Sequence, residues 1–441
     1  MPAWVNCPVY NAALHYYVKG THAGLGRARL LEAGGMEGGT MLYHKIAAAD
    51  LRSGMYIIDT GVSWLKHPYL YATDGELTEQ ELTSLLAEGY SEAYIDLSRC
   101  RPGTLSPELE ALVPSVARAE TEKFIPPPPK VELKEELPKA RMLFRTSLSM
   151  ARNMMDGIRK GNFDVPSAEP IVEDILESLD RNADALFSLC KLRQKDDYTY
   201  THCVNASVMT TLFARGLGTS SNSLHAIGLG GLFHDVGKAL IPLSILNAPR
   251  RLNDREMEVM KRHPQLGFDF LKQQATVPKE VVQIVLEHHE QYGGEGYPGK
   301  LAGENISLPG RIAAVVDVFD ALTSKRVYKD PMPFSKALSI LYSMRGKEFF
   351  PGMVERFIRL LGVYPMGSAV ELEDGSKSVV SEPNMAAPMR PKVVLVRDKD
   401  GKDMGKRSCD LTEDGSPGIT KAISSKELGA DPADILGVPV P

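Results

Sequence analysis

Apolar residues recur at helical spacing through the middle of the chain. In the segments 169–192 and 311–324, the apolar side chains fall on one face of a helix. These positions are Val172, Ile175, Leu179, Leu186 and Leu189 in the first segment, and Ile312, Val315, Val316 and Phe319 in the second. Because this helical character persists along the surrounding sequence, residues 139–363 are predicted to form an all-α domain.

The region before residue 103 has a different pattern. Strands are expected at 55–59 (MYIID) and from Ala93 (AYIDLS), and the helix between them carries a capping signal, Thr78 followed by Glu81. Residues 41–102 are therefore predicted to form a small α+β domain. Residues 1–40 are rich in glycine and alanine and follow neither period, which indicates a poorly ordered leader.

Two further segments flank the predicted helical domain. Residues 103–138 include the proline run 126–129 and are expected to be an extended linker. Residues 364–441 contain Asp-Gly turn dipeptides at 374–375 and 400–401 and the apolar run KVVLVRD, which predict a short β-rich tail with a partly disordered end. The expected fold class is thus multidomain, with an all-α domain between a small α+β domain and a β-rich tail.

Charge, hydropathy and cysteine content indicate which kinds of partner and which cellular compartment to expect. The net charge of −5 offers no basic excess, so we expect no dedicated binding of DNA or RNA. No stretch reaches the ~18–20 apolar residues of a membrane helix, and the first residues lack the pattern of a secretory signal. The 5 cysteines are scattered without a C-x-x-C pair, as in proteins of a reducing compartment. A cytoplasmic location without membrane attachment is expected.

Histidines cluster within the predicted helical domain, and several of them adjoin an acidic residue or another histidine. The packets are His202 after a Tyr-Thr-Tyr-Thr run, His234-Asp235, His263-Pro264, His288-His289-Glu290 and Asp317-Val-Phe-Asp320. An isolated histidine is more often structural, and His225 is interpreted in that way. Adjacent His-Asp and His-His pairs can instead reach a metal at the edge of a helix. Histidine and aspartate without cysteine are ligands that suit Fe, Mn or Zn.

These packets resemble the motifs of a known family. HDVGK, HP, HHEQYGGEGYP and DVFDALTSKRVYK, in this order, are similar to those of HD-GYP domains, a branch of the HD superfamily of metal-dependent phosphohydrolases. The resemblance covers roughly residues 140–365 and implies an HD-type helical fold. The segment from about 45 to 99 is similar, more loosely, to a small domain of unknown function that precedes HD-GYP domains in bacteria.

The resemblance implies a role for each matching residue. The implied metal ligands are His202, His234, Asp235, His263, His288, His289 and Asp317. Asp235 would bridge two metal ions and Lys238 would neutralise a phosphate oxygen, so both are assigned as catalytic. Arg326 and Lys329 match residues that grip the phosphates of a cyclic dinucleotide. The Gly296–Pro298 loop would shape the substrate pocket and contact diguanylate cyclase (GGDEF) domains.

Three assignments come from weighing the residues themselves. Tyr297 could stack on a guanine base or simply pack in its turn. Glu290 could orient a neighbouring ligand or face solvent. Asp320 could orient a ligand or pair with Lys325 on its own helix. We take Tyr297 as substrate-binding, and Glu290 and Asp320 as residues that orient ligands.

The resemblance also implies a reaction. The expected activity is metal-dependent hydrolysis of cyclic di-GMP to linear pGpG, GMP or both. Some family members that bind a third metal carry Glu where this chain has Tyr198, so two divalent ions are expected, Fe or Mn ahead of Zn. Gly293 replaces an Asp that is common in the loop motif, which leaves the loop conformation open.

Several alternatives remain open from the sequence. The domain could be a catalytically silent sensor of cyclic dinucleotides, or an HD-type phosphohydrolase for another nucleotide. The upstream α+β domain could instead be the functional part, with the helical domain as its regulator. The sequence also leaves open whether the chain forms a homodimer.

Overall fold

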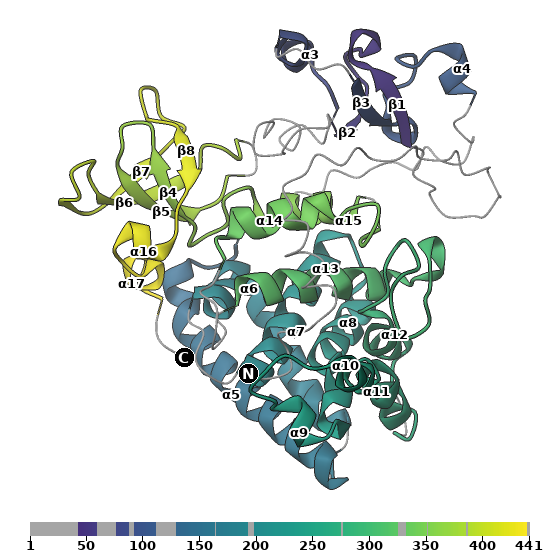
Figure 1. The fold of residues 1–441 in the computed structure, drawn as a ribbon. Helices are drawn as coiled ribbons and strands as arrows, with labels where there is room; N and C mark the ends of the chain where they lie inside the picture. The colour runs from purple at the N-terminus through teal and green to yellow at the C-terminus, as the bar shows by residue number, and fades with distance from the viewer. Residues whose placement is uncertain are drawn as a thin grey trace. The chain divides into compact units, whose positions relative to one another are not determined.

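The computed structural model describes most of the chain and divides it into two compact units. The described residues are 43–59, 76–87, 92–111, 129–163, 165–192, 198–274, 277–324, 332–350, 352–384 and 387–438. The described residues within 43–111 belong to the smaller unit, and those within 129–384 and 389–438 belong to the larger one (Figure 1). The predicted leader, Arg326 and Lys329 lie outside the described residues.

The smaller unit is the predicted α+β domain. Its antiparallel sheet has the order β1-β3-β2, formed by β1 (Tyr43–Ala47), β2 (Ile57–Asp59) and β3 (Glu92–Asp96). The helices are α3 (Glu79–Ala87) and the single turn α4 (Pro107–Glu110). The predicted cap of α3 is present, because the backbone N–H of Thr78 donates to Glu81 and that of Glu81 donates to the Thr78 hydroxyl.

The larger unit contains the predicted all-α domain. Its helices are α5 (Leu133–Lys160), α6 (Glu169–Leu192), α7 (Tyr198–Gly216), α8 (Ser221–Phe233), α9 (Leu243–Leu246), α10 (Asp254–Met260), α11 (His263–Leu271), α12 (Lys279–Glu287), α13 (Leu308–Thr323), α14 (Phe334–Ser343) and α15 (Met353–Leu361). The apolar face predicted for 169–192 is buried in the core that α5, α6, α7 and α8 share. The helix is not continuous, because Asn182 has extended backbone angles that interrupt α6.

The start of α5 lies inside the segment predicted as a linker. The helix begins at Leu133 and includes Pro138, whose missing N–H leaves the carbonyl of Lys134 without its helical partner. Ion pairing to α6 fixes this first part of α5: the guanidinium of Arg181 donates to the buried carboxylate of Glu136 at 2.8 Å. Tertiary contacts therefore outweigh the local proline signal that suggested an extended chain.

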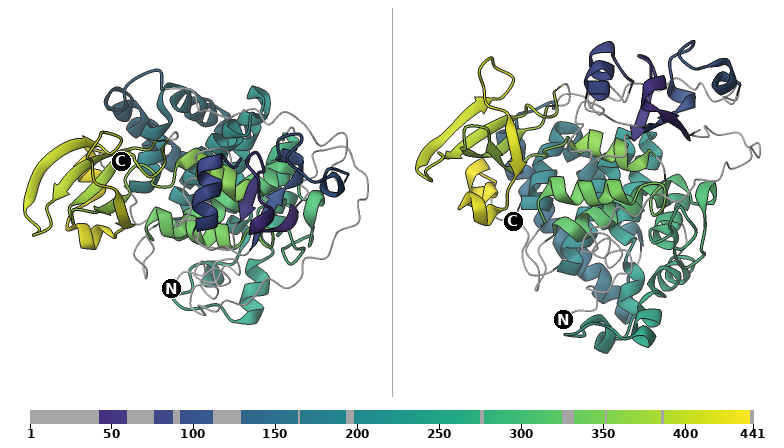
Figure 2. Two further views of the ribbon diagram at one scale, coloured as in Figure 1. Left: turned by 90° about the horizontal axis from the view of Figure 1, so that it is seen from above. Right: turned by 45° about the horizontal axis from the view of Figure 1, so that its top comes forward.

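The predicted β-rich tail is a five-stranded antiparallel sheet, which both views of Figure 2 show in green to yellow. Its order is β7-β6-β5-β4-β8, from β4 (Ala369–Leu372), β5 (Lys377–Glu382), β6 (Lys392–Arg397), β7 (Asp403–Asp410) and β8 (Ile419–Ala422). Gly375 and Gly401 take positive φ angles in the two predicted turns.

The end of the chain differs from the disorder expected of it. Residues 425–436 carry two short helices, α16 (Ser425–Leu428) and α17 (Pro432–Leu436). Ala433 and Val438 are buried in the core of the helical domain, and this apolar burial gives the tail a defined place. Among the described helices of the whole chain, none is long and apolar enough to cross a membrane.

Candidate metal centre

Five helices of the larger unit bring the seven predicted ligands together. His202 lies on α7, His234 and Asp235 follow α8, His263 begins α11, His288 and His289 follow α12, and Asp317 lies on α13. All seven side chains are buried and form two groups, one with His202, His234 and Asp317, the other with Asp235, His263, His288 and His289. Within each group the candidate ligand atoms lie within 4.8 Å of one another.

Glycines let these helices approach closely enough for the ligands to meet. A Cβ atom on Gly231 of α8 would lie 2.9 Å from the Cα of Ser207 on α7, and one on Gly230 would lie 3.2 Å from the Cα of Val281 on α12. A Cβ on Gly237 would overlap the carbonyl oxygen of His263. The glycine-rich run at 228–231 therefore places α8, which ends just before His234, against α7 and α12.

Backbone carbonyls orient several of the imidazole rings. The Nδ1 atom of His263 lies 2.9 Å from the carbonyl oxygen of Met260, and that of His288 lies 3.0 Å from the carbonyl of Ile284. With Nδ1–H as the donor in each ring, both Nε2 atoms carry a lone pair, and they face each other at 3.2 Å. Burial lowers the pKa of His263 to about 4, which keeps that ring neutral and able to bind a metal.

This geometry fits a shared cation. Two nitrogens each ~2.1 Å from one ion and roughly 100° apart would be separated by about 3.2 Å. Two facing lone pairs without a cation between them would repel each other. Asp235 Oδ1 and His289 Nδ1 are also buried without a hydrogen-bond partner among the described residues. The donor set and these unpaired atoms both suit a divalent metal.

Asp235 connects the two groups through its two oxygens. Oδ1 lies 3.2 Å from Nε2 of His263, in one group, while Oδ2 lies 3.4 Å from Nε2 of His234, in the other. The ammonium of Lys238 also contacts Oδ2. Burial works against ionisation of this carboxyl, but Lys238 and His234 hold the pKa of Asp235 well below its usual range. The group is therefore a carboxylate with one oxygen facing each set of ligands.

Asp320 holds the ring of His202 from behind. One of its oxygens accepts a hydrogen bond from His202 Nδ1 at 2.6 Å, and the other accepts from Lys191 Nζ at 2.5 Å and Asn205 Nδ2 at 2.8 Å. Burial lowers the pKa of His202, but the carboxylates of Asp317 and Asp320 raise it to about 9. Surroundings that favour a proton on this ring also favour a metal cation beside it.

Two of these residues were not singled out from the sequence. Asn205 lies three residues after His202, close to one helical turn, so helical spacing could have identified it. Lys191 is separated from Asp320 by 129 positions along the chain, and no local pattern marks it. The alternative partner of Asp320, Lys325, lies outside the described residues.

Glu290 holds the loop that follows the His288-His289 pair. Its carboxylate accepts hydrogen bonds from the backbone N–H groups of Gly299 at 2.5 Å and Leu301 at 2.9 Å. These bonds position the loop, because they give partners to backbone N–H groups of its chain. The expected role of Glu290 in orienting a ligand stays a prediction. The ring of Tyr297 stacks on His289 with 4.7 Å between centroids, so the loop reaches the metal ligands.

Three family models match successive segments of the chain. Residues 169–351 match "HD domain", residues 43–163 match "Domain of unknown function (DUF3391)", and residues 369–431 match "KOW domain associated with HD domain". A cyclic di-GMP phosphodiesterase of Pseudomonas aeruginosa is 35% identical over 352 residues, which is 79% of this chain and 84% of that protein. This chain belongs to the HD-GYP family of cyclic di-GMP phosphodiesterases.

Other relatives match a smaller share of the chain. The response regulator RpfG of Xanthomonas campestris, named a cyclic di-GMP phosphodiesterase, is 40% identical over 41% of this chain and 48% of its own length. A 3'3'-cGAMP-specific phosphodiesterase of Vibrio cholerae is 35% identical over 36% of this chain and 30% of its own length. A solved HD-GYP-like structure from Bdellovibrio bacteriovorus covers 71% of this chain and 98% of its own, at 16% identity and a TM-score of 0.42, too distant to support an argument.

Proposed function

We propose that this chain hydrolyses cyclic di-GMP at a centre that binds two divalent metal ions. The observation that carries the proposal is the carboxylate of Asp235, which turns one oxygen toward each of the two ligand groups. A carboxylate with one oxygen facing each group could bind both ions and keep them close together. His/Asp ligands favour Fe or Mn, with Zn as the alternative.

Metals in such a centre activate water as a nucleophile and offset negative charge on a phosphate. In the overall reaction, water adds to phosphorus and the bond to the 3′ oxygen breaks, which leaves a 5′-phosphate and a 3′-hydroxyl. Cleavage of one phosphodiester gives linear pGpG, and cleavage of both gives GMP.

The residues around the centre bind the substrate in this proposal. Lys238, beside Asp235, supplies positive charge to a phosphate oxygen. The ring of Tyr297, already stacked on His289, offers a face for a guanine base. Arg326 and Lys329 would bind the phosphates, as the sequence predicts. Contact of the loop with diguanylate cyclase domains, a homodimer and a cytoplasmic location also remain predictions.

The test is the substitution Asp235→Asn. It removes the charge that both ion positions share while keeping the shape of the side chain, so turnover of cyclic di-GMP should fall at least about 100-fold. Metal content, measured by mass spectrometry of anaerobically purified protein, should fall from two ions per chain. Asp269→Asn, on the exposed face of α11, is the matched control and should behave as wild type. Wild-type turnover in Asp235→Asn would refute the binuclear centre.

A second candidate is hydrolysis of a related cyclic dinucleotide. It is favoured by the Vibrio cholerae relatives that are named 3'3'-cGAMP-specific phosphodiesterases. Comparing kcat/KM for cyclic di-GMP and 3'3'-cGAMP on the same preparation decides between the two substrates. If neither is cleaved while two metals are bound, the silent-sensor alternative is favoured instead.

A further inference from the structure

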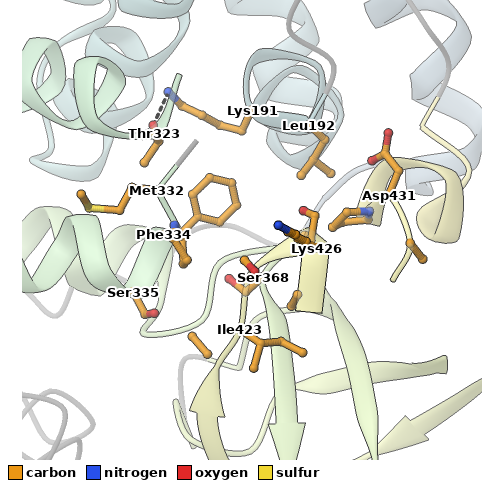
Figure 3. A pocket seen from close by; sticks show the side chains of 18 residues that line it. Lys191, Leu192, Thr323, Met332, Phe334, Ser335, Ser368, Ile423, Lys426 and Asp431 are labelled. Atoms are coloured by element: carbon orange, nitrogen blue, oxygen red, sulfur yellow. Dashed lines mark hydrogen bonds between the residues drawn. The ribbon is translucent and has the colours of Figure 1, made fainter. Parts of the chain in front are cut away.

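A pocket away from the metal ligands lies between the helical domain and the C-terminal sheet of the larger unit. Its volume is about 520 Å³, within the range usual for small-molecule sites. One side is formed by the end of α6, the end of α13 and the start of α14, and the other by β4, β8 and the α16–α17 segment. Figure 3 shows the side chains from both sides surrounding the same space.

The lining combines an apolar surface with polar groups that can bind a ligand. Phe334 and Ile423 provide the apolar surface. Ser368 is only 5% exposed, and its buried hydroxyl has no hydrogen-bond partner among the described residues. Lys426 contributes a positive charge to the lining. A buried hydroxyl without a partner is costly, so a ligand that binds it would be stabilised.

We propose that this pocket binds a nucleoside monophosphate, the smallest product of the proposed reaction. The aromatic ring of Phe334 suits a nucleobase, Lys426 suits a phosphate, and the Ser368 hydroxyl supplies a hydrogen bond. The choice of nucleotide rests on the proposed function, whereas the pocket and its polar groups do not. Bound nucleotide would act as feedback from product to enzyme.

Hydrogen bonds connect this pocket to the metal centre. Lys191 and Thr323 both line the pocket, and the Lys191 ammonium donates to the Thr323 hydroxyl at 3.1 Å and to Asp320 at 2.5 Å. Asp320 in turn holds the Nδ1 atom of His202. A ligand that shifts Lys191 therefore changes the hydrogen bonding of a metal ligand without entering the active site.

The experiment measures binding of GMP to the metal-loaded, full-length chain by isothermal titration calorimetry. Lys426→Glu should weaken one GMP site at least tenfold, because it replaces a cation by an anion beside the phosphate. Lys402→Glu, an exposed lysine of the β6–β7 turn, is the matched control and should stay within twofold of wild type. Guanosine, which lacks the phosphate, should bind wild type and Lys426→Glu with equal affinity.

Kinetics provides the second readout. GMP should lower kcat of the wild-type and Lys402→Glu enzymes at saturating cyclic di-GMP, and this effect should be lost in Lys426→Glu. Unchanged GMP affinity in Lys426→Glu, or inhibition that saturating substrate abolishes completely, overturns the proposal. If the chain does not cleave cyclic di-GMP, the calorimetry still decides about the pocket, so the two proposals can fail separately.

Discussion

A single buried carboxylate, Asp320, connects the candidate metal ligands to the rest of the helical domain. It lies behind His202 and accepts hydrogen bonds from that ring, from Lys191 and from Asn205. Both members of the Lys191–Asp320 ion pair have fully buried side chains, so removing one would leave the other buried without its partner. Asp320, which orients the ring of His202, is thus itself positioned by Lys191 of α6 and Asn205 of α7.

We expect Asp320→Asn to weaken metal binding by about 10- to 100-fold, because the ring of His202 loses the carboxylate that fixes its orientation and raises its basicity. Metal titration monitored by calorimetry measures the effect. Asn205→Ala, which removes a neutral partner of the same carboxylate, should have a smaller effect. Equal metal affinity in Asp320→Asn and wild type would show that the hydrogen bond to His202 is not needed.

At the residue scale, short packets such as His234-Asp235 and His288-His289 indicated a metal site, and the resemblance to HD-GYP domains implied the full set of ligands. The same reading could not assign Glu290, since its partners are backbone groups of a loop whose conformation the sequence does not specify. Lys191 was missed for a related reason. A lysine at the end of an amphipathic helix normally points into solvent, and its burial follows only from how α6 packs.

At the scale of elements, the centre depends on how closely α8 approaches its neighbours. Gly228 and Gly231 face α7, while Gly230 faces α12. This short run of glycines therefore lets α8 pack closely against both helices. The periodicity of apolar residues predicted the helices of this domain but gave no information on these distances. Nor did it predict the interruption of α6 at Asn182, where a hydrogen bond to the carbonyl of Val131 competes with the regular helix.

Gly231→Ala tests the close contact of α7 and α8. The added methyl group would lie 2.8 Å from the carbonyl oxygen of Ala206, so the helices must separate and move His234 away from His202. We expect metal affinity to fall at least tenfold and the free energy of unfolding to fall by about 1–3 kcal/mol. Gly218→Ala, at the turn after α7 where an added Cβ would touch nothing, should cost only the strain of its positive φ and leave metal affinity unchanged. A Gly231→Ala protein with wild-type metal affinity would contradict this account.

At the scale of the whole molecule, the C-terminal segment completes the helical domain. Ala433 belongs to the same buried core as residues of α5, α6 and α8. Sequence patterns predicted the strands of this segment, since its turns carry Asp-Gly pairs. They could not predict that its last helix packs against residues more than two hundred positions earlier, because single apolar residues such as Ala433 give no periodic signal.

Ala433→Asp should therefore destabilise the whole larger unit. The substitution places a charge in an apolar core, which we expect to cost about 3 kcal/mol or more. Thermal unfolding followed by circular dichroism measures the loss. Asp434→Ala, at the exposed neighbouring position of α17, should change the free energy of unfolding by less than about 0.5 kcal/mol. Similar melting temperatures for both variants would mean that α17 does not contribute to the core.

The distribution of the ligands over five helices has a thermodynamic consequence. Ions bound there would cross-link α7, α8, α11, α12 and α13, and an unfolded chain would have to release them. Free metal at 100 times its dissociation constant would add about 2.7 kcal/mol per independent site to the free energy of unfolding. The melting temperature should fall on chelation in wild type and much less in Asp235→Asn. The free energy of unfolding would then rise and fall with the concentration of free metal in the surrounding solution.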